Sequence, residues 1–189
     1  MSLLNLRHCC RFSAGQNNQY IKIPCMRHII SIIVMVLMTS CYEKRAPMRM
    51  DLEGQRLPSF DIQLIDSTTY LNTASIPTGK PFALLYFSPY CPYCKAQMEE
   101  IVKDMDRLKD IQFYLLTGFR ISDMKQFSEE YKLSKYPNVI VARDTSQFFA
   151  QYFAIPGVPY TAIYGKDKKL HKSFAGKVLG RQLKAVAGN

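Results

Sequence analysis

The spacing of hydrophobic and polar positions after residue 56 changes repeatedly between two periods. Alternation at every second residue and short apolar runs are typical of strands, and apolar residues three and four apart are typical of helices. This pattern predicts strands at 59–65, 68–71, 82–87, 111–116, 138–142, 158–164 and 169–174. It predicts helices at 92–108, 121–133, 145–153 and 178–186, the third of them with Asp144 as its N-cap. The order indicates an α/β domain, in which an N-terminal β-hairpin precedes a central mixed sheet flanked by helices.

A short apolar segment precedes this domain. Arg27 is followed by an apolar run of about ten residues at 29–38, too short for a membrane span of roughly 20 residues but typical of a signal-peptide core. Thr39 and Ser40 are small residues directly before Cys41. The segment resembles the lipobox of bacterial lipoproteins, with Met38 where Leu is usual. The resemblance implies lipidation at Cys41, and a plain secretory signal with an incidental cysteine is the alternative.

The chain therefore divides into four parts. Residues 1–25 are expected to be a misassigned start, 26–40 a lipoprotein signal peptide, 41–55 a polar tether and 56–189 the folded domain. The expected location is the bacterial cell envelope, with a lipid anchor in the membrane. Because Tyr42 is not Asp, the outer membrane facing the periplasm is favoured.

Composition and charge narrow the function classes. An apolar content of 48% excludes a mainly disordered chain. The net charge of +10 suggests nucleic-acid binding, but residues 1–40 contain four basic residues and no acidic one, so their removal lowers it to +6. The remaining charge is diffuse and the chain is expected to be exported, so we expect no nucleic-acid partner. The domain is expected to be a monomer without a cofactor.

The strongest chemical signal is Cys-Pro-Tyr-Cys at 91–94, between a buried strand and an amphipathic helix. Pro92 suits the first helical position, where an N–H would have no partner, so Cys91 caps the helix. The unpaired N–H groups and the helix dipole favour a thiolate there, which makes Cys91 the expected nucleophile. Cys94 lies within disulfide reach on the inward face and is expected to be the resolving, less exposed cysteine.

Other uses of two cysteines fit less well. A structural zinc site needs about four ligands, whereas the domain offers two cysteines and His171. A copper-delivery protein would have three residues between the cysteines, and a peroxiredoxin would have proline where Leu84 or Phe87 stands. A structural disulfide closing so short a loop adds little stability. We therefore expect no metal site, and we interpret His171 as a solvated residue.

Three motifs carry a family resemblance: L-P-S-F, Y-F-S-P-Y-C-P-Y-C-K and G-V-P-Y-T, spread over about 57–186. In order and spacing they resemble thioredoxin-fold proteins, and within that fold the TlpA-like thiol–disulfide oxidoreductases. The resemblance implies a cis peptide bond at Pro159, facing the cysteines, and a Val158 backbone that pairs with an extended substrate. It also implies protein thiol or disulfide substrates and a redox partner protein. An ordinary trans proline at the start of a strand is the alternative.

The aromatic residues around the motif suggest a substrate surface. Tyr90 and Tyr93, together with Phe87 and Tyr160, are expected to form an apolar rim for extended protein substrates. A solvent-facing scatter of common tyrosines is the alternative.

The sequence departs from the family at three positions. Tyr90 stands where Trp is frequent, Gln97 where the helix often carries Glu, and Leu85 where thioredoxin has a buried Asp. Both usual proton acceptors for the resolving thiol are thus absent. Two hypotheses follow: a membrane-anchored thiol–disulfide oxidoreductase, or a thioredoxin-fold adaptor lipoprotein with a vestigial dithiol. The intact Cys-x-x-Cys and G-V-P motifs favour the enzyme, and the missing acids favour the adaptor slightly.

Overall fold

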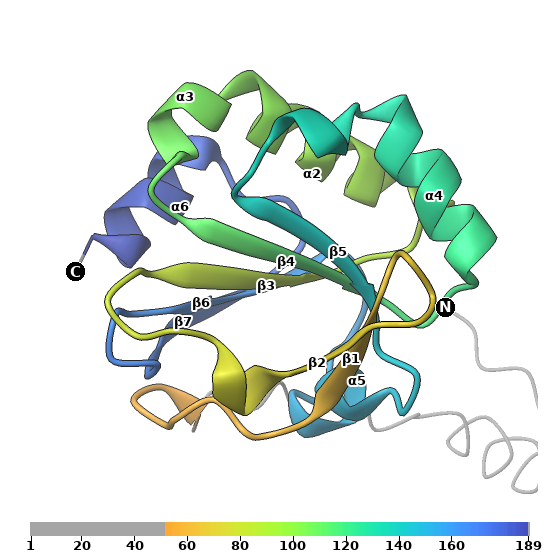
Figure 1. Cartoon of the computed structure of the whole chain (residues 1–189). Helices are drawn as coiled ribbons and strands as arrows, with labels where there is room; N and C mark the ends of the chain where they lie inside the picture. The colour runs from red at the N-terminus through yellow and green to blue at the C-terminus, as the bar shows by residue number, and fades with distance from the viewer. Residues whose placement is uncertain (1–51, 189) are drawn as a thin grey trace, which may run out of the picture. The chain divides into compact units, whose positions relative to one another are not determined.

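Seven strands form one mixed sheet in the order β2-β1-β5-β4-β3-β6-β7 (Figure 1). The computed structural model describes residues 52–188. The strands are β1 (Asp61–Leu64), β2 (Tyr70–Asn72), β3 (Phe82–Tyr86), β4 (Gln112–Thr117), β5 (Val139–Arg143), β6 (Tyr160–Tyr164) and β7 (Leu170–Ala175). All seven lie where the sequence predicts them, with ends shifted by at most two residues. β3, β4 and β5 are parallel, and the pairs β3–β6, β6–β7, β1–β2 and β1–β5 are antiparallel. The mixed sheet and the N-terminal hairpin are thus confirmed.

Helices cover both faces of the sheet. They are α2 (Pro92–Lys103), α3 (Met105–Leu108), α4 (Ile121–Glu130), α5 (Phe148–Tyr152) and α6 (Gly180–Ala187), with 3-10 turns η2 (Thr73–Ser75) and η3 (Leu133–Lys135). In Figure 1, α2, α3, α4 and α6 lie on one face and α5 on the other. All of β3 is buried because alternate side chains enter two cores, Ala83 and Leu85 on the α2 side and Phe82, Leu84 and Tyr86 on the α5 side.

Two predicted helices differ in the structure. The helix expected at 92–108 is interrupted at Asp104, where φ is −104° and ψ is 14°, so it becomes α2 and α3. The helix expected at 145–153 starts only at Phe148, and its N-cap residue is Gln147 rather than Asp144. The Asp144 carboxylate still accepts the Phe148 and Phe149 N–H groups, at 3.0 and 2.9 Å. It reaches them from outside the helix, across a residue with a φ of 55°.

The domain begins before residue 56. Leu52 is buried in the core on the α5 side, although the sequence assigns it to the tether. The Gly54 N–H donates to the Leu170 carbonyl at 2.7 Å, and the Leu170 N–H donates to the Gln55 carbonyl at 2.9 Å. Residues 52–55 therefore pack along β7. The expected start, signal peptide and Cys41 anchor lie outside the described residues. Across 52–188, no helix has the length and apolar character needed to cross a membrane.

Candidate functional site

Strand register brings the Cys-Pro-Tyr-Cys motif and the G-V-P-Y-T motif to one edge of the sheet. Tyr86, the last residue of β3, pairs with Tyr160, the first residue of β6. The loop after β3 leads to Cys91 and the loop before β6 contains Val158 and Pro159. We call this side of the molecule the dithiol edge. The segments 86–94 and 158–160 thus meet although more than 60 residues separate them in the chain.

Cys91 occupies the N-cap of α2, as the sequence predicts. Its backbone is extended, with a φ of −81° and a ψ of 122°, and Pro92 follows at the first helical position. Its carbonyl accepts the N–H groups of Cys94 and Lys95, at 3.0 and 3.1 Å. The thiol is half-exposed and donates to the Val158 carbonyl, with an Sγ···O distance of 3.6 Å. An incoming sulfur can therefore reach Cys91 beside a fixed backbone carbonyl.

Pro159 lies next to this contact. The Val158–Pro159 peptide bond is cis, so the expected cis proline is confirmed, and Pro159 is buried. Its carbonyl accepts the Gly176 N–H at 2.8 Å, which joins the loop before β6 to the end of β7. The segment Val158–Pro159 is therefore held by Cys91 through the Val158 carbonyl and by Gly176 through the Pro159 carbonyl.

Cys94 lies beneath Cys91 and is only 2% exposed, which confirms it as the less exposed sulfur. Its Sγ accepts the Ser88 backbone N–H at 3.4 Å. Burial raises the pKa of Cys94 to about 12; the Ser88 hydrogen bond opposes this effect and the neighbouring Cys91 adds to it. Cys94 therefore carries its proton at neutral pH and has to lose it when it attacks.

Gln97, which stands where the family often has an acid, is completely buried. Its Oε1 accepts the Val178 N–H at 2.6 Å and its Nε2 donates to the Val178 carbonyl at 3.0 Å. The amide thus ties α2 to the segment before α6. Glu99 is exposed, and Glu100 accepts the Gly180 N–H at 3.2 Å, which lowers the pKa of Glu100. Among the described residues, no carboxylate forms a hydrogen bond with Cys94.

The aromatic rim differs from the prediction. Tyr90 and Tyr93 are 62% and 70% exposed, as expected. Phe87 and Tyr160 are buried, at 2% and 0%, so their assignment to the rim is wrong. Phe87 packs on Phe127, with ring centroids 4.6 Å apart, and Tyr160 packs among the aromatic rings of the α5 side.

Phe119 lies beside Tyr90, a neighbour that sequence reasoning missed. It is 39% exposed and meets Tyr90 edge-on, with ring centroids 5.4 Å apart. The signal that could have found it is its place: it lies two residues after β4, whose end lies beside the end of β3 in the parallel register.

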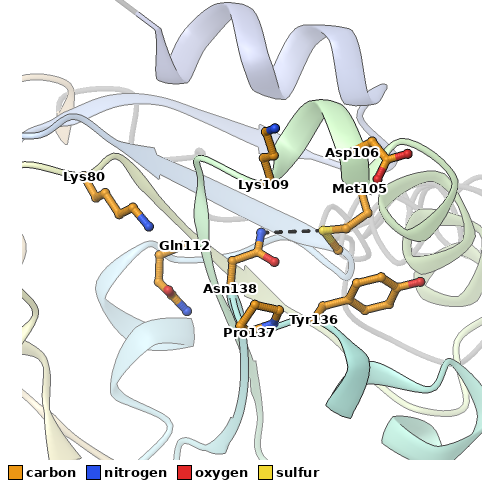
Figure 2. Close-up of a pocket in the computed structure, with 8 residues that line it drawn as sticks. All are labelled: Lys80, Met105, Asp106, Lys109, Gln112, Tyr136, Pro137 and Asn138. Atoms are coloured by element: carbon orange, nitrogen blue, oxygen red, sulfur yellow. Dashed lines mark hydrogen bonds between the residues drawn. The ribbon is translucent and has the colours of Figure 1, made fainter.

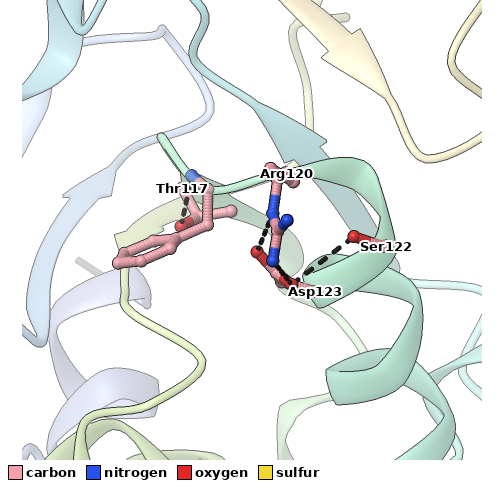
Figure 3. A network of polar contacts seen from close by, with 5 residues as sticks. Thr117, Arg120, Ser122 and Asp123 are labelled. Carbon is pink, nitrogen blue, oxygen red and sulfur yellow. Dashed lines mark hydrogen bonds and ion pairs between the residues drawn. The ribbon is translucent and has the colours of Figure 1, made fainter.

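A polar network of Arg120, Ser122 and Asp123 lies at the start of α4 (Figure 3). The Arg120 guanidinium holds Asp123 with two contacts of 3.2 and 3.3 Å, and Ser122 donates to the same carboxylate at 3.4 Å. Arg120 lowers the pKa of Asp123. A small hollow of about 60 Å³ runs between Tyr90, Asp123 and the ion pair of Lys95 with Glu130. No pattern in the sequence predicted this network.

His171 is not the fully solvated residue that the sequence suggested. Its Nδ1 lies 3.1 Å from the Val186 carbonyl of α6, and the side chain is half-buried. It lies on the edge strand β7, as expected, and its role is to join that strand to α6.

The fold of this domain is found in solved structures of other proteins. The structure is similar to a secreted disulfide oxidoreductase of Mycobacterium tuberculosis that is homologous to E. coli DsbE. The TM-score is 0.56 at 18% sequence identity, over 67% of this chain and 92% of that one. The domain has a thioredoxin-like fold, as the sequence predicts.

Two relatives are similar in sequence. One is an uncharacterized protein of Haemophilus influenzae, 28% identical over 67% of this chain and 84% of its own length. The other is the methylamine utilization protein MauD of Methylophilus methylotrophus, 23% identical over 62% of this chain. The chain spans about half (53%) of MauD. No protein-family model matches the chain.

Proposed function

We propose that the protein is an exported, membrane-anchored thiol–disulfide oxidoreductase that exchanges disulfides with protein partners through Cys91 and Cys94. The observation that carries the proposal is the pairing of unlike sulfurs: a half-exposed Cys91 at a helix N-terminus and a buried Cys94 one turn below it. A disulfide placed for stability alone would gain nothing from this difference in exposure. The thioredoxin-like fold and the disulfide oxidoreductase among its neighbours support the same class.

In the first step the Cys91 thiolate attacks one sulfur of a substrate disulfide. A bond forms between Cys91 Sγ and that sulfur while the substrate S–S bond breaks, and the second substrate sulfur leaves as a thiolate. The exposed end of α2 lets the substrate sulfur approach, and the Val158 backbone lies beside the reacting Sγ. An extended substrate segment is positioned there by backbone contact with Val158 and Pro159.

In the second step Cys94 attacks Cys91 Sγ. The Cys91–Cys94 disulfide forms and the first substrate sulfur leaves as a thiolate, so the substrate gains the two electrons that the dithiol loses. Cys94 must give up a proton, and its raised pKa means that a base has to accept it. The substrate thiolate released in the first step is such a base. The Ser88 N–H stabilises charge that develops on Cys94 Sγ. A dithiol of a partner protein restores the reduced state, and the reverse steps oxidise a client.

The rim suits protein substrates better than small thiols. Tyr90, Tyr93 and Phe119 present apolar rings around Cys91 while the hollow beside them carries both charge signs. Such a surface accepts an unfolded or extended segment with mixed side chains. Lipidation at Cys41 and placement in the cell envelope complete the proposal, and they rest on the sequence pattern.

The test is turnover of insulin disulfides with a dithiol reductant. We expect catalysis above the uncatalysed rate, loss of it in Cys91→Ser, and a trapped mixed disulfide in Cys94→Ser. A wild-type chain that is folded but gives no rate above background would favour the adaptor hypothesis.

A further inference from the structure

Exposed basic side chains gather at the sheet edge opposite the dithiol. They are Arg56, Lys80, Lys109, Lys166 and Lys169, which we call the basic end. Register places them together, because Phe82 pairs with both Gln112 and Tyr164 at this edge. The Gly79 N–H also donates to the Lys166 carbonyl at 2.9 Å. The dithiol lies past the other end of β3, about 17 Å away by the length of a five-residue strand.

Acidic partners do not neutralise the basic end. Asp110 bonds Lys184 at 2.9 Å, and Lys184 together with Lys109 and Lys80 lowers the pKa of Asp110. Asp167 pairs loosely with Lys169, at 3.7 Å. The ammonium groups of Lys80, Lys109 and Lys184 therefore share the Asp110 carboxylate, which leaves an excess of positive charge.

A cavity of about 280 Å³ opens among these side chains (Figure 2). Lys80, Lys109 and the acidic Asp106 all line it. The Nε2 atom of Gln112, another lining residue, is buried and has no acceptor among the described residues. The exposed ammonium groups of Lys80 and Lys109 are therefore the groups that this end of the molecule presents to an anionic surface.

The chain enters the domain at the basic end. Besides the bonds of Gly54 and Gln55 to Leu170, the Leu57 N–H donates to the Lys168 carbonyl at 3.1 Å. Residues 42–51 separate the expected lipidated Cys41 from Leu52, and ten residues span at most about 35 Å. An anchor at Cys41 would therefore attach to the domain at this end and hold the whole domain within reach of the membrane, so the charge of the two ends decides which one faces the bilayer.

We propose that the basic end is a docking surface for an anionic lipid bilayer, which turns the dithiol edge toward the aqueous space. The proposal rests on the proposed anchor for proximity and goes beyond it in fixing an orientation. Membrane charge acts over a Debye length of about 8–10 Å, shorter than the sheet, so it attracts the near end selectively. Each lysine near an anionic surface strengthens binding roughly fivefold.

The test is lysine labelling of the full chain in phosphatidylcholine vesicles, with and without phosphatidylglycerol, read by mass spectrometry. We expect labelling of the basic end to slow several-fold in the anionic vesicles and to recover at about 1 M salt, where the Debye length is about 3 Å. Lys125 on α4 and Lys177 beside the dithiol edge serve as internal controls and should not change. Equal labelling of the basic end in both lipids would overturn the proposal.

Matched variants make the result independent of the anchor. In an unlipidated Cys41→Ser background, Lys80→Gln with Lys166→Gln should reduce flotation with anionic vesicles by more than tenfold. Lys125→Gln with Lys177→Gln removes the same charge elsewhere and should reduce it much less. An equal loss of flotation in both double variants would mean that net charge alone determines binding, and it would contradict the docking surface. Insulin turnover and the mass of the Cys41 peptide report separately on the proposed chemistry and on lipidation.

Discussion

Replacing Gln97 by Ala removes a buried amide that holds α2 to the segment before α6. Gln97 exchanges two hydrogen bonds with the Val178 backbone, at 2.6 and 3.0 Å, and both residues are at most 2% exposed. Without the amide, the Val178 N–H and carbonyl lose their partner, and each unsatisfied buried group costs about 1–3 kcal/mol. Including the cavity left behind, we expect Gln97→Ala to lower the free energy of unfolding by about 3–5 kcal/mol.

Urea unfolding at pH 7 measures this loss. Glu99→Ala, on the exposed face of the same helix, is the matched control and should stay within about 0.5 kcal/mol of the parent. Insulin turnover per folded molecule should stay nearly unchanged in Gln97→Ala, because both polar groups of the amide bond Val178 rather than a cysteine. A loss below about 1 kcal/mol would refute the reasoning, since it would mean that Val178 does not depend on Gln97.

Gln97→Glu gives the same test a pH dependence. A neutral carboxyl can both accept and donate to Val178, but an ionised one cannot donate, and burial also favours the neutral form. The folded pKa of the introduced carboxyl should therefore lie above its unfolded value of about 4.3. Its contribution is fully present below about pH 4.3 and is lost as pH rises through the folded pKa. We expect the stability gap to the parent to be smaller at pH 4 than at pH 7; a constant gap would contradict this.

Three further outcomes are expected. Because burial raises the pKa of Cys94 to about 12, the thiol should stabilise the fold below the unfolded pKa of about 8.5 and lose that contribution between about 8.5 and 12. Urea midpoints of the reduced protein should therefore fall more steeply above pH 8.5 than those of Cys94→Ser, and parallel curves would contradict the raised pKa. Cys41→Ser should abolish membrane association in bacterial fractionation, and unchanged fractionation would exclude the lipid anchor. Tyr90→Ala and Phe119→Ala should each raise KM for insulin at similar kcat, with effects that do not add, because the rings touch at 5.4 Å. If the effects of the two substitutions on KM add fully, Tyr90 and Phe119 do not act as one contact surface.

Sequence was sufficient where the signal is local. The apolar run at 82–87 predicts the strand β3, and the proline after Cys91 predicts the start of α2. The spacing of Cys94 along one helix face predicts that it is the less exposed sulfur. The cis proline came from the family resemblance rather than from any spacing.

Sequence was insufficient where an outcome depends on distant partners. Phe87 and Phe119 are both aromatic residues that follow a strand, yet only Phe119 is exposed, because Phe127 of α4 covers Phe87. The bond of Gln97 to Val178 spans 81 positions of the chain. The pairing of residues 52–55 with the edge strand β7 is equally non-local, so the domain boundary was placed too late.

The most direct test of the dithiol chemistry is mass spectrometry of adducts formed with a disulfide-containing peptide. In Cys94→Ser, we expect one peptide joined to Cys91 and stable for as long as no free thiol is added. In Cys91→Ser, we expect no adduct at neutral pH, because Cys94 is buried and protonated. The unsubstituted chain should instead end with a Cys91–Cys94 disulfide and free peptide thiols. Adducts that form on Cys94 as readily as on Cys91, or no Cys91–Cys94 disulfide after reaction, would contradict the assignment of attacking and resolving sulfurs.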